Sequence, residues 1–158
     1  MTLSPQQKQA IVDRHNEIRG QVYPSATNMQ KLNMAWSTAS DPMEAIKEWQ
    51  KEIDNFKYGT NSGKVFGRYS QLIWDETGRV GCGMADCSQF LANYPTFFIC
   101  NYAVGGNTNW AGRGWIPYTQ GDSCGACPGK CDSTGKLCDC GGLVCNGGTV
   151  DVSTCSCK

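Results

Sequence analysis

The sequence lacks the features that would assign it to several large functional classes. Lys+Arg and Asp+Glu are equal at 14 each, so no charge excess favours a general binder of nucleic acid or anionic membranes. It has no run of about 18 apolar residues for a transmembrane helix and no N-x-S/T sequence for N-glycosylation. The first residues, MTLSPQQKQ, lack the apolar centre of a signal peptide, so we expect Met1 to begin a mature or recombinant form.

Cysteine, in contrast, is abundant: there are 11, and eight of them lie between Cys124 and Cys157. In a reducing cytosol this density would serve only metal binding, whereas an oxidising compartment would make it a disulfide framework. A zinc site would have Cys124-x2-Cys127 as its best feature, but no histidine lies nearby. We therefore expect a secreted, extracellular protein, in which the odd count leaves one thiol free or paired between molecules.

The N-terminal part of the chain predicts a helix. Ser4 can cap it, Pro5 suits its first position and Gln7 completes a capping box. Apolar residues then recur at helical spacing until Gly20, which can end the helix. The stretch 22–40 that follows is predicted to be a loop with an apolar patch at Leu32, Met34 and Trp36.

A second helix is predicted to begin at Asp41-Pro42 and to end before Gly59. Its apolar residues are spaced three, four and three apart, which indicates one buried stripe: Ile46, Trp49, Ile53 and Phe56. A third, short helix is expected over 67–74. Two strands rich in Val, Phe, Ile and Tyr are expected over 79–86 and 96–103, joined by a loop that holds Cys87 and Pro95.

The C-terminal part differs in composition from the rest. From Gly105 onward Gly, Asn, Ser and Asp dominate, and the last part of the chain has almost no large apolar side chains. Such a segment cannot form a hydrophobic core of its own and must be held by crosslinks. We place a boundary near Gly121.

Several motifs, in the right order, resemble those of the CAP superfamily, which includes cysteine-rich secretory proteins, venom allergens and plant pathogenesis-related proteins. They are HNEIR (15–19), NMQKLNMAW (28–36), EAIKEWQKEIDNFKYG (44–59), GRYSQLIW (67–74) and FFICNYAVGGN (97–107). The resemblance covers roughly residues 3–121 and implies an α+β fold, a CAP-type α-β-α sandwich with an antiparallel sheet. It further implies three regions: a CAP domain (1–121), a hinge-like cysteine-rich module (122–139) and a partial EGF-like module (140–158), the last two forming a small disulfide-rich tail.

The resemblance also implies a truncation. In the family, a segment with a helix, a histidine and a strand normally follows the tryptophan that matches Trp36, but here Ser37 follows directly. The missing segment is expected to leave apolar surface exposed on the layer that Trp36 and Trp49 help to cover, with lower stability. Exposed apolar surface of this kind favours a partner or a second copy.

The family often carries a metal site of two His and two Glu, of which this sequence retains one ligand. Glu52 matches the second Glu, Arg68 stands where the second His is expected, and the other two fall in the missing segment. Because Arg has no lone pair to donate, the resemblance implies a lost metal site. Arg68 either forms an ion pair with Glu52 in place of the metal or is a solvated surface residue. Glu52, Arg68 and Ser70 are our candidate binding residues in the remnant cleft.

Catalysis is not expected. Ser70 would need a general base, and the only histidine, His15, lies on the apolar stripe of the first helix. The family places that histidine in the core with both ring nitrogens hydrogen-bonded. Ser70 is more typical of a capping or hydrogen-bonding residue.

The resemblance implies most of the cysteine pairs. They are Cys82–Cys100 between the strands and, in the hinge-like module, Cys124–Cys131 and Cys127–Cys138. The last four cysteines leave three pairings open, of which we choose Cys140–Cys155 and Cys145–Cys157. The family partner of Cys87 is missing, so Cys87 is expected to be a free thiol or to link two molecules.

Three functions follow. The first is partner binding without catalysis, at a receptor or ion channel, because venom members act on channels and the tail would form a rigid polar knob. The second is sterol or lipid carriage in an apolar groove, to which the stretch from Tyr94 to Phe98 would contribute, although Phe97 and Phe98 can alternate across a strand. The third is proteolysis, which the lost site argues against. No cofactor is expected.

Overall fold

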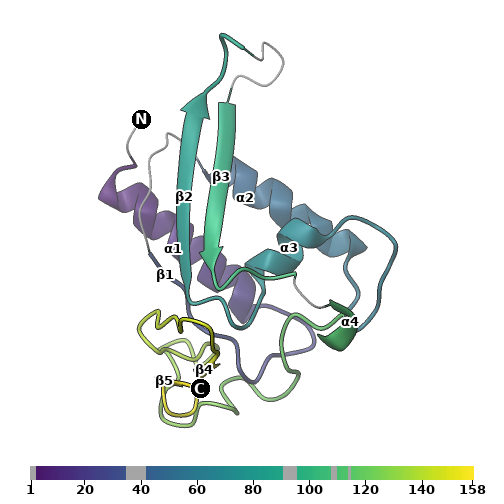
Figure 1. The fold of residues 1–158 in the computed structure, drawn as a ribbon, viewed down its shortest axis with the longest axis vertical. Coiled ribbons are helices and arrows are strands. Elements are labelled where there is room, and N and C mark those ends of the chain that lie inside the picture. The colour runs from purple at the N-terminus through teal and green to yellow at the C-terminus, as the bar shows by residue number, and fades with distance from the viewer. Residues whose placement is uncertain (1–2, 35–41, 91–95, 108–109, 114) are drawn as a thin grey trace.

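The computed structural model describes residues 3–34, 42–90, 96–107, 110–113 and 115–158 (Figure 1). Its first helix, α1 (Pro5–Gly20), has the predicted bounds. The Ser4 hydroxyl accepts from the Gln7 backbone at 3.2 Å, and the Gln7 side chain accepts from the Ser4 backbone at 2.9 Å, which completes the capping box. No helix in the described part of the chain is long and apolar enough to cross a membrane.

The second predicted helix is in fact two elements. An α-helix, α2 (Met43–Gln50), passes directly into a 3₁₀ helix, η1 (Lys51–Asn55). The tighter turn of a 3₁₀ helix shifts the phase of the side chains, so Ile53 is 47% exposed whereas Glu52 is buried. The prediction of a continuous apolar stripe was therefore wrong at Ile53. The predicted cap, Asp41, and Trp36 lie outside the described residues.

A short helix, α3 (Gly67–Leu72), follows and ends two residues earlier than predicted. The sheet has the order β1 (Asn33–Met34), β2 (Arg79–Asp86) and β3 (Thr96–Ala103). The long strands have the predicted bounds and pair antiparallel, but β1 pairs parallel to β2, so the sheet is mixed rather than purely antiparallel.

The described long helices cover one face of the sheet. His15 of α1 contacts Tyr102, and Trp49 of α2 stacks on Phe98, and both of these β3 side chains point to the same face. Figure 1 shows β2 and β3 crossing in front of α1 and α2. On the opposite face, Phe97 and Ile99 are 56% and 47% exposed. Exposed apolar side chains in the described part of the chain thus lie on the face opposite Trp49, in addition to Ile53 of η1, which continues α2. That the missing segment causes this exposure stays a prediction.

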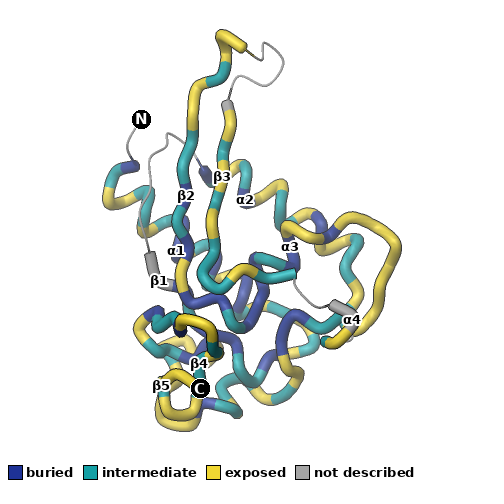
Figure 2. The backbone as a smooth tube through the Cα atoms, in the orientation of Figure 1, coloured by how far each residue is buried: buried dark blue, intermediate teal, exposed yellow. Residues whose placement is uncertain are grey.

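The buried residues of α1, α3 and the lower part of β2 form one core (Figure 2). The tail is joined to this core rather than projecting from it as a knob. Cys138 donates its backbone N–H to Met29 O at 2.7 Å and its carbonyl accepts from Lys31 at 2.8 Å, while Leu137 is 2% exposed within the core cluster. The expectation that crosslinks alone would hold the tail is therefore incomplete.

Three further short elements lie in the C-terminal part. They are α4 (Trp110–Arg113) and a two-stranded ribbon of β4 (Val150–Asp151) and β5 (Ser156–Cys157). Arg79 of β2 donates to the carbonyl of Gly142 at 2.6 Å, which ties the end of the chain to the sheet.

Candidate functional site

Glu52 and Arg68 meet where η1 contacts the start of α3. Arg68 Nε lies 2.6 Å from Glu52 Oε1, and Glu52 Oε2 accepts from the backbone N–H groups of Arg68 at 2.9 Å and Tyr69 at 3.1 Å. Glu52 is turned inward by the 3₁₀ geometry described above. Both of its oxygens are engaged, and its side chain is 7% exposed.

Arg68 presents the rest of its guanidinium to solvent. Its side chain is 59% exposed, and only Nε has a partner in the described part of the chain. A guanidinium has five N–H donors in a planar fork, so its outer edge can still bind a carboxylate. The sequence left two alternatives for Arg68, an ion pair with Glu52 or a solvated surface position. The structure has the ion pair, and the outer edge of the guanidinium stays accessible to solvent.

These residues do not fit a metal ion. Glu52 contributes the one carboxylate at this position and is fully engaged, and Arg68 offers no lone pair. Nowhere in the described ranges do three His, Cys, Asp or Glu side chains come together as a possible metal site.

The ion pair should show energetic coupling. In a double-mutant cycle of Glu52→Gln and Arg68→Met, we expect about 0.5–1 kcal/mol of coupling in urea unfolding, limited by solvent screening at Arg68. The exposed pair Glu48 and Lys51 on the same segment is the control and should show no measurable coupling. Equal results for the two pairs would assign Arg68 to the solvated surface.

Ser70 is not accessible to a substrate. It is 0% exposed, and its hydroxyl lies 2.6 Å from Asn107 Oδ1 and 3.0 Å from the carbonyl of Phe66. Asn107 in turn donates to the carbonyl of Gly67 at 2.7 Å. The hydroxyl therefore fastens the loop after β3 to α3 and is not poised as a nucleophile.

His15 is a framework residue. Nδ1 lies 2.8 Å from the carbonyl of Ile11 and must donate, so Nε2 accepts from the Tyr102 hydroxyl at 3.0 Å. Burial, opposed by the hydrogen bond to Ile11, lowers the pKa of His15 to about 4. A neutral imidazole with both nitrogens engaged cannot serve Ser70 as a base.

This burial predicts a pH dependence of stability. Because the folded-state pKa of His15 is about 4 and the unfolded value is 6.5, the unfolded chain binds the proton first as pH falls through this window. The free energy of unfolding should drop by about 2 kcal/mol between pH 7 and pH 5. Urea unfolding of His15→Gln should begin from a lower stability but show a flatter slope, and an unchanged slope would contradict the assignment.

A cavity of about 390 Å³ lies beside these residues. Its wall is formed by α2, α3, β3 and the following loop, through Trp49, Gly67, Arg68, Gln71, Phe98, Ile99, Cys100, Tyr102 and Asn107. Phe97 and Phe98 do alternate across the strand, and of these two residues only Phe98 lines the cavity. Tyr94 lies outside the described residues.

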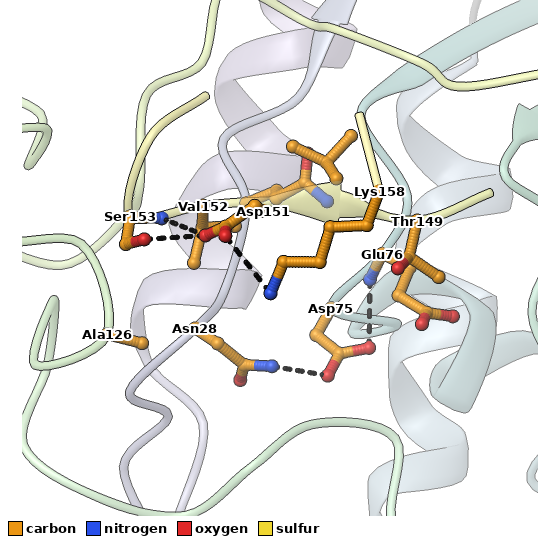
Figure 3. A pocket seen from close by; sticks show the side chains of 11 residues that line it. Asn28, Asp75, Glu76, Ala126, Thr149, Asp151, Val152, Ser153 and Lys158 are labelled. Atoms are coloured by element: carbon orange, nitrogen blue, oxygen red, sulfur yellow. Dashed lines mark hydrogen bonds and ion pairs between the residues drawn. The ribbon is translucent and has the colours of Figure 1, made fainter. Parts of the chain in front are cut away.

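A second, polar cavity of about 340 Å³ separates the core from the end of the tail (Figure 3). Lys158 Nζ lies 3.1 Å from Asp151 Oδ2 on one side, and Asn28 donates to Asp75 at 2.8 Å on the other. Its charged groups thus already have partners, which leaves less for a charged ligand than the exposed edge of Arg68 does.

Sequence reasoning missed two buried charged groups. Arg19 is 1% exposed and donates to backbone carbonyls of Gln30, Leu72, Trp74 and Thr77. Burial lowers its pKa to about 10, so it stays cationic. The sequence predicted that Arg19 lies in the last turn of the helix, but helical periodicity could not show which carbonyls would face its side chain.

Asp75 is the second such group. It is 2% exposed, and Arg113 binds both of its oxygens at 3.0 Å while lying 4.4 Å above the Trp74 ring. Burial raises the pKa of Asp75, and Arg113 and Asn28 oppose this. The contacts link the loop before β2 to α4 and serve structure.

Five disulfides form in the structure. They are Cys82–Cys100, Cys124–Cys131, Cys127–Cys138, Cys140–Cys155 and Cys145–Cys157. These are the pairs that the sequence led us to choose, and Cys87 is unpaired and partly exposed.

Cys87 should therefore react as a single thiol. Intact-mass analysis after alkylation of the unreduced protein is expected to show one adduct, mapped to Cys87, because the other cysteines are crosslinked. Cys87→Ser should show none. A disulfide-linked dimer, or adducts at other cysteines, would contradict this arrangement.

Comparisons with known proteins show which family the chain resembles. A profile of the cysteine-rich secretory protein family (CAP) matches residues 36–102. Human cysteine-rich secretory protein 3 is 31% identical over 172 aligned positions, covering 84% of this chain and 69% of the relative. Cysteine-rich venom protein Mr30 from Conus marmoreus is 31% identical over 150 positions, and the chain spans 46% of its length. The alignment with the human protein is longer than the chain's own 158 residues, so that relative has residues with no counterpart here.

Solved structures share the fold. Hookworm platelet inhibitor superposes with a TM-score of 0.68 at 19% identity, covering 88% of this chain and 93% of the other. NaASP2, solved with Zn²⁺, superposes with a TM-score of 0.65 at 19% identity, covering 86% and 96%. At this identity they show the fold alone, and they confirm the CAP-type architecture expected from the motifs.

Proposed function

The chain belongs to the cysteine-rich secretory protein family, and on that premise we propose that it is a secreted, non-catalytic protein that acts by binding an extracellular protein such as a receptor or ion channel. Secretion is supported by the names of its relatives, which are secretory and venom proteins, and by its five disulfides.

One observation carries it: the remnant cleft keeps a binding group but no reacting group. Arg68 presents free N–H donors beside an apolar cavity. Ser70 is buried against Asn107, Glu52 is engaged at both oxygens, and His15 is neutral and bonded at both nitrogens. No nucleophile and base lie within reach of each other in this set, so nucleophilic catalysis has no physical support.

The test has a catalytic and a binding arm. Incubation of the full chain with a mixed peptide library, followed by mass spectrometry, should give no cleavage beyond that of buffer. Turnover that is lost in Ser70→Ala would overturn the proposal. The full chain, labelled with a fluorophore, should bind saturably to cells that display candidate receptors or channels, whereas the reduced and alkylated chain should not. Absence of saturable binding across such a panel of cells would count against the proposed function.

Lipid carriage is a second candidate, favoured by the aromatic wall of the cavity at Trp49, Phe98 and Tyr102. It is less well supported, because a hydrocarbon would leave the backbone polar groups along this wall without partners. Transfer of a fluorescent sterol into the protein, abolished by Phe98→Asp but not by the exposed neighbour change Phe97→Asp, would favour it over protein binding.

A further inference from the structure

The outer edge of β3 is unpaired in the described structure. The sheet order places β3 at its end, paired with β2 alone. The register pairs Cys100 with Cys82, and the Cα atoms of this pair lie 4.0 Å apart. In antiparallel sheets a separation near 4.5 Å marks the pairs without hydrogen bonds, and about 5.5 Å marks those with them.

Cys100 therefore points its N–H and C=O away from β2. Because this direction alternates along a strand, Phe98 and Tyr102 point theirs outward as well. Ala103, which is an odd number of residues from Cys100, instead directs its carbonyl to the β2 side, where it accepts from Gly78 N–H at 2.9 Å. None of the outward backbone groups of Phe98, Cys100 and Tyr102 has a hydrogen-bond partner among the described residues.

The apolar cavity runs along this same edge. Residues from both faces of β3 line the cavity: Ile99 from one face, and Phe98, Cys100 and Tyr102 from the other. No residue of β2 lines it. Trp49 of α2, which stacks on Phe98, and Arg68 of α3 also line it. The edge thus combines unpaired backbone groups, an apolar trough and one cation with free donors.

We propose that the open edge of β3 binds an extended peptide segment of a partner protein, which pairs as an added strand and places a carboxylate on Arg68. Alternate side chains of such a segment would point into the trough against Trp49 and Phe98. The backbone bonds would supply affinity, while the trough and Arg68 would supply specificity. This rests on the proposed function, since it names the kind of partner and the surface that receives it.

Charge favours a partner segment over a second copy of this chain. Strand β3, TFFICNYA, has no acidic residue, so pairing two β3 edges would leave both Arg68 guanidinium groups without a carboxylate. Glu52 cannot meet this need, because it already binds Nε and two backbone amides.

The test uses two synthetic peptides, Thr-Val-Thr-Val-Thr-Glu-Thr and Thr-Glu-Thr-Val-Thr-Val-Thr, because the direction of pairing is open. Amide exchange of the full chain is followed by NMR with increasing peptide. We expect saturable binding of at least one peptide and slower exchange at Phe98, Cys100 and Tyr102, with little change at Phe97, Ile99 and Asn101. N-methylation of one alternate set of peptide amides should abolish binding, and methylation of the other set should be tolerated.

Charge is tested separately. Arg68→Met in the protein, and Glu to Gln in the peptide, should each weaken peptide binding about threefold. Because both changes remove the same ion pair, the two together should weaken binding no more than either does alone. Lys130→Met, an exposed cation in the tail, is the control and should have no effect.

Three results would overturn the proposal: no saturable binding of either peptide, equal sensitivity to the two N-methylated sets, or protection of the three amides by raising protein concentration alone, which would assign the edge to a second copy. Mass spectrometry of the bound peptide distinguishes failure of the strand-edge proposal from failure of the proposed function. A cleaved peptide would refute non-catalytic binding, whereas an intact peptide that binds elsewhere would refute only the strand-edge site.

Discussion

Replacement of Arg19 by methionine is expected to destabilise the protein by about 4 kcal/mol or more, or to prevent folding. Arg19 is 1% exposed, and its guanidinium donates to five backbone carbonyls from two segments of the chain, Gln30 and residues 72–77, at distances from 2.6 to 3.5 Å. Removing it leaves several buried acceptors without donors, each of which costs about 1–3 kcal/mol. Urea unfolding of purified, oxidised protein would measure the change.

Arg14→Met is the matched control on the same helix. Its side chain is partly exposed and bonded to Glu17 and Gln50 at the surface, so its loss should have a small effect. Arg19→Lys should lie between the two, because an ammonium keeps the charge but lacks the planar fork that reaches several carbonyls at once. A loss for Arg19→Met no larger than that for Arg14→Met would show that these carbonyls find other donors.

The second large effect is expected at Leu137. Although it belongs to the cysteine-rich tail, it is 2% exposed and packs in the core cluster with Ile18 and Met29. Leu137→Ala should lower the free energy of unfolding by about 3 kcal/mol, through lost transfer energy and the cavity left behind. The disulfides Cys127–Cys138 and Cys124–Cys131 would remain, so the loss reports packing and not crosslinking.

Leu143→Ala serves as the comparison, because Leu143 is in the tail but only partly buried. Leu143→Ala should lower the free energy of unfolding by about 1 kcal/mol or less. If the two substitutions cost the same, the tail does not share the core of the domain. The result matters for function, since a tail that shares the core cannot be removed to isolate a binding activity of residues 1–121.

The elements with strong local signals were predictable from the sequence. Ser4, Pro5 and Gln7 fixed the start of α1, because capping depends on neighbours three residues apart. The bounds of β3 followed from a run of β-branched and aromatic residues. Strand β2 also has the predicted bounds, although Val80 is its one β-branched residue. The helix after Pro42 was harder, because its change to 3₁₀ geometry at Lys51 comes with a contact of Glu52 to the amides of α3, and that contact joins segments distant in sequence.

The candidate site was partly predictable. The replacement of a histidine by Arg68 and the retention of Glu52 were visible in the motifs, and they sufficed to argue that a metal site is lost. The distance of 2.6 Å between the two side chains, the burial of Ser70 and the unpaired edge beside them were not visible. No periodicity or composition reports which strand stands at the end of a sheet.

By itself, the sequence determined the family, a cysteine content that suits a disulfide framework, the long elements and the identity of the residues left in the cleft, because these depend on composition and on spacing within one segment. Only the tertiary structure decided that Leu137 joins the core and, among the residues that it describes, which face of the sheet is uncovered and that the outer edge of β3 is unpaired along an apolar cavity. These features depend on packing between segments far apart in the chain, whose geometry is set by the whole folded core and not by any local pattern.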